Sequence, residues 1–168
     1  MTTQAQTCDT SLVVERYRQL VYRLCLTHTR CRGDADDVFQ EVFLTYHRKQ
    51  PACDGEEHRK AWLIRTTLTV ARRVAASSWE RRVVLGAEDE AGIPDTARFE
   101  AEDHEVLFRA LLDLPETYRS ALHLFYFEDL PIARIAALLE QSPGAVKTRL
   151  SRGRALLRDA MKEDPHAQ

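Results

Sequence analysis

The chain has 168 residues, 44% of them hydrophobic and 30% charged, which fits a protein of one or two small domains. Its formal net charge of −2 argues against a stand-alone DNA-binding protein, because salt-sensitive contacts to phosphates supply most non-specific affinity for DNA. The sequence predicts no signal peptide, and charged residues interrupt every apolar run well short of a membrane-spanning length. We therefore expect a soluble cytoplasmic protein without membrane insertion, whose cysteines are reduced.

Charge is unevenly distributed along the chain and indicates three parts. Residues 1–82 carry a net charge of +4, residues 83–105 a net charge of −7 and residues 106–168 a net charge of +1. The middle part contains Gly86, Gly92 and few large apolar residues, as in a flexible linker. Helical periodicity on both sides of it predicts an all-α fold of two small helical domains joined by an acidic linker.

Two helices are predicted at the start of the first domain. Residues 12–31 place apolar side chains at helical spacing, and Gly33 is expected to end this helix. Asp34 is then expected to cap a second helix, with Asp36 and Asp37 in its first turn, where the helix dipole favours negative charge. The expected buried stripe of this second helix consists of Phe39, Val42, Phe43 and Tyr46.

A second face of the same helix is mostly polar and consists of Asp37, Gln40, Glu41 and Leu44. Most exposed carboxylates have no partner, so the pattern taken alone favours an ordinary solvated face. A functional role for this face needs an independent indication.

The third predicted helix runs from His58 to about Arg82 and follows a loop from Pro51 to Glu57. For Trp62 on this helix, core packing is favoured over stacking on a nucleic-acid base. The arginines of the helix are dense enough to follow a nucleic-acid backbone, although Arg is also common on solvated helices rich in Ala. These arginines are Arg65, Arg72, Arg73, Arg81 and Arg82.

The last domain contains a pattern typical of a helix-turn-helix. Residues 132–139 place apolar side chains at helical spacing, and a short polar connection leads to a second helix. Ser142 is suited to cap this second helix, and Pro143 fits its first position. Such a turn often holds a glycine, and here Glu140 or Gln141 has to take that position.

The second helix of the pair has five basic side chains between residues 141 and 158 and no acidic one. Val146, Leu150 and Leu157 lie on one apolar face. The other side of the helix is available to a polyanion, which favours DNA recognition in the major groove over a solvated surface helix. The residues on that side are Lys147, Thr148, Ser151, Arg152 and Arg154.

Cys25, His28 and Cys31 follow one another at three-residue steps and form a candidate metal site, with Cys53 further along the chain. Ligands of this kind suit zinc. However, a helix rotates by about 300° over three residues, so Cys25 and Cys31 lie about 120° apart around its axis and cannot easily meet at one ion. We predict no metal and no cofactor. Because the sequence also lacks a nucleophile–base pair and a phosphate-binding glycine loop, we predict that the chain is not an enzyme.

Four segments follow one another in a distinctive order: Asp34-Ala-Asp-Asp-Val-Phe-Gln-Glu-Val-Phe-Leu, Ala61-Trp-Leu-Ile-Arg, Leu114-Pro-Glu-Thr-Tyr-Arg and Gly144-Ala-Val-Lys-Thr-Arg-Leu-Ser-Arg-Gly-Arg. This order resembles bacterial RNA polymerase sigma factors of the extracytoplasmic-function type, which keep only the two regions called region 2 and region 4. The resemblance covers roughly Leu12 to Met161. It is highly specific, because two ordered sets of motifs occur with a linker between them.

The resemblance implies a transcription initiation factor that binds core RNA polymerase and directs it to specific promoters. In the family, an Asp-x-x-Gln-Glu face docks on the clamp coiled coil of the largest polymerase subunit. The implied partners also include the flap region of the polymerase, promoter DNA and an anti-sigma factor. On this chain the expected polymerase-binding residues are Asp37, Gln40, Glu41 and Leu44.

The resemblance also assigns two DNA contacts. Region 2 opens the minus-ten promoter element and catches a flipped base with the loop before the third helix and with residues of that helix, here Arg65, Thr69, Arg72 and Arg73. Region 4 reads the minus-thirty-five element through the second helix of the helix-turn-helix, called the recognition helix. The expected residues there are Ser142 at the helix start, Lys147, Thr148, Ser151 and Arg152 on the bases, and Arg149 and Arg154 on phosphates.

The chain departs from the family where promoter melting takes place. Many members have Asn at the position of Thr69, Asp at that of Arg73 and a denser basic run where this chain has Val74-Ala-Ala-Ser-Ser. At Thr69 a single hydroxyl replaces the paired donor and acceptor of an amide. An alternative therefore stays open, in which the chain is a sigma-like DNA-binding regulator or interaction protein that does not itself open promoters.

Overall fold

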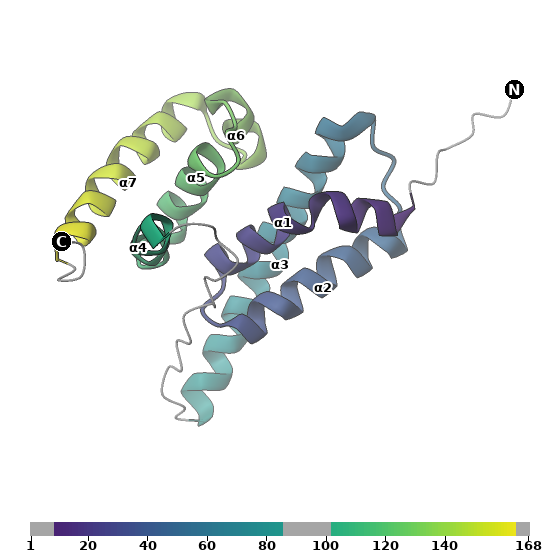
Figure 1. Cartoon of the computed structure of the whole chain (residues 1–168), viewed down its shortest axis with the longest axis horizontal. Helices are drawn as coiled ribbons and strands as arrows, with labels where there is room; N and C mark the ends of the chain where they lie inside the picture. The colour runs from purple at the N-terminus through teal and green to yellow at the C-terminus, as the bar shows by residue number, and fades with distance from the viewer. Residues whose placement is uncertain (1–8, 86–101, 164–168) are drawn as a thin grey trace, which may run out of the picture. The chain divides into compact units, whose positions relative to one another are not determined.

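The computed structural model describes residues 9–85 and 102–163, and every regular element in these two ranges is an α-helix. The chain divides into two compact units, Met1–Glu90 and Ala91–Gln168. Unit 1 contains α1 (Thr10–His28), α2 (Arg32–Lys49) and α3 (Gly55–Leu85), as Figure 1 shows. Unit 2 contains α4 (Glu102–Leu112), α5 (Glu116–Tyr126), α6 (Ile132–Leu138) and α7 (Pro143–Glu163). The predicted all-α fold is confirmed.

The three helices of unit 1 pack against one another around a single core. Each contributes side chains with no exposed surface, including Leu24 from α1, Val42 from α2 and Leu63 from α3. Removing such a side chain from water stabilises the fold by about 1.5–3 kcal/mol. Because these side chains recur at helical spacing, one face of each helix is turned inward and the other is left available for partners. No helix in the described ranges is long and apolar enough to cross a membrane.

The junction between α1 and α2 differs from the prediction. α1 ends at His28, because Thr29 adopts an extended conformation and its hydroxyl donates to the carbonyl oxygen of Cys25 at 2.7 Å. The cap of α2 is Cys31, whose Sγ accepts from the backbone N–H of Asp34 at 3.4 Å. The expectation that Gly33 ends the first helix and that Asp34 caps the second was therefore wrong. Asp34 instead lies buried in the first turn of α2, and Gly33 is part of that helix.

The connection between α2 and α3 is shorter than predicted. α2 ends at Lys49 and is capped by Gln50, which has a positive φ of 40° and donates its N–H to the carbonyl oxygen of Tyr46 at 2.8 Å. α3 begins at Gly55, whose φ of 83° suits glycine, and not at His58. Glu56 therefore belongs to the helix, where the dipole favours its charge. Only residues 51–54 separate the left-handed residue that ends α2 from α3.

The expected linker from 83 to 105 overlaps with helices at both ends. α3 continues past Arg82 to Leu85, and α4 begins at Glu102. Residues 86–101, the central part of the expected linker, lie outside the described residues.

In unit 2, α7 packs against α4, α5 and α6. The contact between α5 and α7 depends on Gly153, a residue that the sequence analysis did not single out. A Cβ atom at this position would lie 2.9 Å from Leu122 Cδ1 and 3.3 Å from Tyr118 Cβ. Leu122 is itself almost completely buried, so it has little room to move aside. The absence of a side chain at Gly153 therefore permits the close packing of α5 against α7.

We expect Gly153→Val to destabilise unit 2 by about 1–3 kcal/mol, because the added atoms overpack the α5–α7 contact. The matched control is Gly144→Val on the same helix, where an added Cβ meets nothing within 4 Å. Its effect should stay within about 0.5 kcal/mol. Hydrogen exchange of the α5 and α7 amides in the full chain measures both changes. Equal protection in the two variants would contradict the packing role of Gly153.

Candidate nucleic-acid interface

The turn between α6 and α7 adopts the geometry that a helix-turn-helix requires. Glu140 takes the left-handed position, with a φ of 54°, and the N–H of Gln141 donates to the carbonyl oxygen of Ala136 at 2.9 Å. Ser142 caps α7, since its Oγ accepts from the N–H of Ala145 at 3.1 Å. Pro143 is the first residue of the helix. The predicted cap and start of this helix are confirmed.

α7 has one buried face and one basic face. Val146 and Leu150 are fully buried, whereas Leu157 is only half-buried. Most of the predicted DNA-contacting residues are exposed, and Arg149 is half-buried. Arg154 is partly engaged within the protein, because its Nε donates to the carbonyl oxygen of Leu150 at 3.2 Å and its guanidinium lies 5.9 Å from the centre of the Phe125 ring. The exposed predicted residues are Ser142 at the cap and, on α7 itself, Lys147, Thr148, Ser151, Arg152 and Arg154.

A second basic face lies on α3. The spacing of the four predicted residues places them on one side of the helix, and all four are exposed. The hydroxyl of Thr69 donates to the carbonyl oxygen of Arg65 at 2.9 Å, which leaves its oxygen lone pairs available to a ligand. Trp62 packs edge-on against Tyr46 with the ring centres 5.5 Å apart, as the core-packing prediction required, although it stays half-exposed. The residues of this α3 face are Arg65, Thr69, Arg72 and Arg73.

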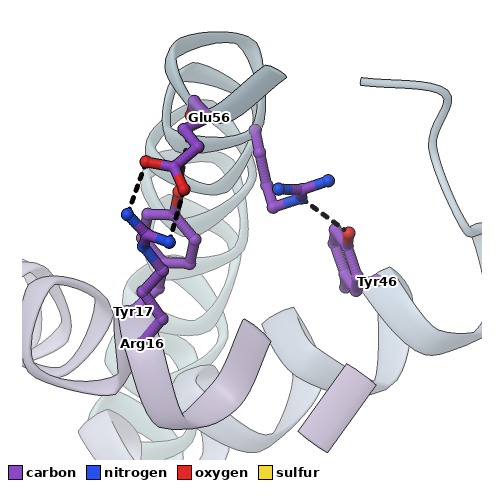
Figure 2. Close-up of polar contacts among 5 residues, drawn as sticks. Arg16, Tyr17, Tyr46 and Glu56 are labelled. Atoms are coloured by element: carbon purple, nitrogen blue, oxygen red, sulfur yellow. Dashed lines mark hydrogen bonds and ion pairs between the residues drawn. The ribbon is translucent and has the colours of Figure 1, made fainter. Parts of the chain in front are cut away.

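Polar contacts fix the start of α3, next to the loop at 51–54. Figure 2 shows the guanidinium of Arg16, on α1, paired with both carboxylate oxygens of Glu56. The hydroxyl of Tyr17 donates to the backbone oxygen of Glu56 at 3.5 Å, and Arg59 donates through Nε to the hydroxyl of Tyr46 at 3.1 Å. Burial raises the pKa of the Tyr17 hydroxyl, and the nearby charge of Glu56 raises it further, so this donor stays protonated at neutral pH.

This cluster around Glu56 was missed in the sequence analysis. Its contacts join residues about 40 positions apart in the chain, such as Arg16 and Glu56. No local pattern links two such residues. The N–H of Asp54 also donates to Nδ1 of His58 at 3.1 Å, so the loop is fixed to the helix that follows it.

The polar face of α2 is turned away from the core. Asp37 and Gln40 are exposed, Leu44 keeps half of its surface exposed, and Glu41 is half-buried. Arg73 of α3 forms an ion pair with Glu41 through one guanidinium nitrogen and Oε1. The structure therefore brings together one residue predicted to bind polymerase and one predicted to bind DNA.

The cysteines near the α1–α2 junction have separate surroundings. Cys25 is completely buried, and burial raises the pKa of its thiol. Cys31 caps α2, while Nδ1 of His28 lies 2.9 Å from the carbonyl oxygen of Leu24. Among the described residues, no group of three or more His, Cys, Asp and Glu side chains is placed to hold a metal ion.

Both units match models of known protein families. Residues 13–82 match the protein-family model of Sigma-70 region 2, and residues 104–157 match that of Sigma-70, region 4. The two matches follow in the expected order and together span most of the chain. The chain belongs to the extracytoplasmic-function sigma factors. It is a transcription initiation factor, of a family that binds core RNA polymerase and promoter DNA.

Two relatives cover nearly the same length as this sigma factor. It is 27% identical over 164 residues to the ECF RNA polymerase sigma factor SigW of Bacillus subtilis (strain 168), covering 90% of this chain and 88% of the relative. It is 28% identical over 157 residues to the ECF RNA polymerase sigma-E factor of Escherichia coli (strain K12), covering 86% of this chain and 82% of the relative.

Two solved structures support the fold of the sigma factor. One is the sigma factor RpoE in complex with the anti-sigma factor NepR from Bartonella quintana, with a TM-score of 0.71 and 20% identity over 93% of this chain and 98% of that chain. The other is CnrH in complex with the cytosolic domain of CnrY, with a TM-score of 0.63 and 23% identity over 92% of this chain and 88% of that chain.

The cluster around Glu56 gives a test of local order in unit 1. We expect Arg16→Gln to speed hydrogen exchange several-fold in the second turn of α3, whose amides donate to the carbonyl oxygens of the first turn. The free energy of global unfolding should fall by less than about 1 kcal/mol, because the ion pair is exposed. Arg18→Gln, an exposed arginine on the same helix, serves as the control and should change neither quantity. Unaltered exchange in Arg16→Gln would rule out this role of the ion pair.

Proposed function

We propose that this sigma factor docks on core RNA polymerase through the exposed polar face of α2, and that this face binds the clamp coiled coil of the largest polymerase subunit. The exposure of Asp37, Gln40 and Leu44 beside Glu41 supports the proposal, since two carboxylates and an apolar side chain suit a basic partner with an apolar stripe. We also propose that unit 2 contacts the flap region of the polymerase.

The loop at 51–54 and the α3 face engage the minus-ten element in this proposal. Opening DNA and flipping a base costs a few kcal/mol, which contacts in the bound state must offset. A loop fixed at both ends loses less conformational entropy on binding than a mobile one. The arginines of the α3 face supply phosphate contacts, and Thr69 supplies one hydrogen-bonding hydroxyl.

α7 reads the minus-thirty-five element in the major groove. In a helix-turn-helix, side chains in the N-terminal half of the second helix reach the bases. The exposed face of α7 carries such side chains, and the packing of its buried face fixes the direction in which they point. We assign Lys147, Thr148, Ser151 and Arg152 to bases. Ser142 at the helix start, Arg149 and Arg154 are assigned to the backbone of the DNA.

Three further assignments follow from the same proposal. The matched structure from Bartonella quintana holds a sigma factor in complex with an anti-sigma factor, which supports an anti-sigma factor as a partner here. The protein acts with the polymerase in the bacterial cytoplasm and performs no catalysis itself. We also retain the three-part organisation, with the first domain extended to Leu85 and the second beginning at Glu102.

A non-initiating role is the second candidate, and Thr69 and Arg73 are the residues that favour it. Thr69 offers a short side chain where melting takes place, and Arg73 is paired with Glu41. The deciding experiment is abortive transcription by core polymerase and this chain, on duplex templates and on templates with a pre-opened bubble. Initiation on both, with a marked gain on the bubble, supports the sigma function. No transcript from either, despite firm polymerase binding, establishes the second candidate.

We expect Asp37→Lys to weaken binding to core polymerase at least tenfold with little loss of helix content, because an exposed charge matters more to a complementary partner than to the fold. Glu15→Lys is the control. It makes the same change of charge at an exposed residue of α1, outside the polar face of α2. Fluorescence titration of core polymerase measures both variants. Equal losses would place the docking site elsewhere.

The division of roles on α7 is tested with two arginines. If Arg152 contacts a guanine edge, Arg152→Ala should cost about 1–3 kcal/mol and relax the preference at one promoter position. Arg149→Ala should instead weaken binding evenly across sequences and reduce its salt dependence. The measurement is selection of bound promoter fragments by the reconstituted holoenzyme. An even loss in both variants would contradict the assignment.

A further inference from the structure

One ion pair connects two surfaces that the proposed function keeps separate. Glu41 lies on the polar face of α2, and Arg73 lies on the basic face of α3. Their side chains are 41% and 63% exposed, so both are within reach of a partner molecule. While the carboxylate of Glu41 is bound to the guanidinium of Arg73, the carboxylate binds the polymerase less strongly than it would alone. The guanidinium likewise binds DNA less strongly.

The position of Arg73 explains why this arginine makes the contact. Arg73 follows Arg72 and therefore points about 100° away from it around the α3 axis. Relative to Arg65, it lies about 80° around the axis, at one edge of the basic face. Since α2 and α3 pack against each other, this edge is the one that meets Glu41.

We propose that the Glu41–Arg73 ion pair couples docking on the polymerase to DNA binding. In the free chain, Arg73 masks Glu41 and Glu41 masks Arg73. When a basic side chain of the polymerase takes Glu41, Arg73 is released and its guanidinium becomes available to a phosphate of the promoter. This inference rests on the proposed docking of α2. It adds that Arg73 restrains polymerase binding in the free chain.

The coupling is modest in size and acts in both directions. Exposed ion pairs of this kind change an equilibrium by about 1.5- to 5-fold. Coupling between two binding sites is reciprocal, so the factor by which polymerase binding aids the DNA contact of Arg73 is also the factor by which DNA aids polymerase binding. The effect therefore has to appear in two independent measurements.

The first measurement is the affinity of full-length variants for core polymerase. We expect Arg73→Gln to tighten binding about 1.5- to 5-fold, because it unmasks Glu41. In the Glu41→Gln background, the same change should have no effect, whereas a general effect of lost positive charge would persist there. Arg65→Gln is the control for loss of a cation on the same helix. It should act alike in both backgrounds.

The second measurement is the affinity of the free chain for a random-sequence single-stranded oligonucleotide at low salt. Glu41→Gln should bind it about 1.5- to 5-fold more tightly than Asp37→Asn, which removes one negative charge from the same face without releasing Arg73. The difference should vanish when Arg73 is also replaced by Gln. Circular dichroism checks that all variants keep their helix content.

The outcomes separate this inference from the proposed function. Firm polymerase binding in which Arg73→Gln acts equally in both backgrounds would overturn the coupling alone. A weakening of polymerase binding by Arg73→Gln would also overturn it. A wild-type chain that bound no core polymerase would overturn the docking proposal and, with it, this inference.

Discussion

The two helices proposed to contact DNA, α3 and α7, each bury one side only. Val146 and Leu150 fix the rotation of α7 about its own axis, and Ile64 and Leu68 do the same for α3. Because each residue turns a helix by about 100°, a one-residue change in the packed positions would turn the basic side chains away from their present direction. The core thus determines which side chains reach a partner. Gly153 also contributes to the packing that positions α7, because it allows α7 to lie close to α5.

The net charge of the chain limits how tightly these two basic faces can bind DNA without a partner. The chain carries a net charge of −2, although both faces are rich in arginine. Affinity for DNA that comes from phosphate contacts is weakened by the acidic residues elsewhere and by salt. Such a protein can select a DNA sequence when a larger partner supplies the affinity for DNA that does not depend on sequence. Membership of a family that binds core polymerase agrees with this distribution of charge.

The sequence was sufficient where structure depends on neighbours in the chain. Ser142 and Pro143 define the start of α7, because capping and proline preference act within one turn. It was insufficient at the α1–α2 junction, where a hydrogen bond from Thr29 to Cys25 ends the helix before Gly33 is reached. It also gave no sign of contacts between distant residues, such as Arg16 with Glu56. The periodicity of apolar side chains predicts which face of a helix is buried. It does not predict which residue of another helix contacts a given side chain.

The same distinction between local and long-range contacts bears on the proposed role of the chain in opening the minus-ten element. In the proposed function, Thr69 offers only one hydroxyl to an open strand. The loop next to α3 is fixed by Gln50, by Gly55 and by the contacts of Glu56, and order that exists before binding does not have to be created during it. We propose that the fixed loop compensates in part for the small side chain of Thr69. On this view the determinants of promoter opening lie as much in the contacts that hold α3 to α1 and α2 as in the residues that touch DNA.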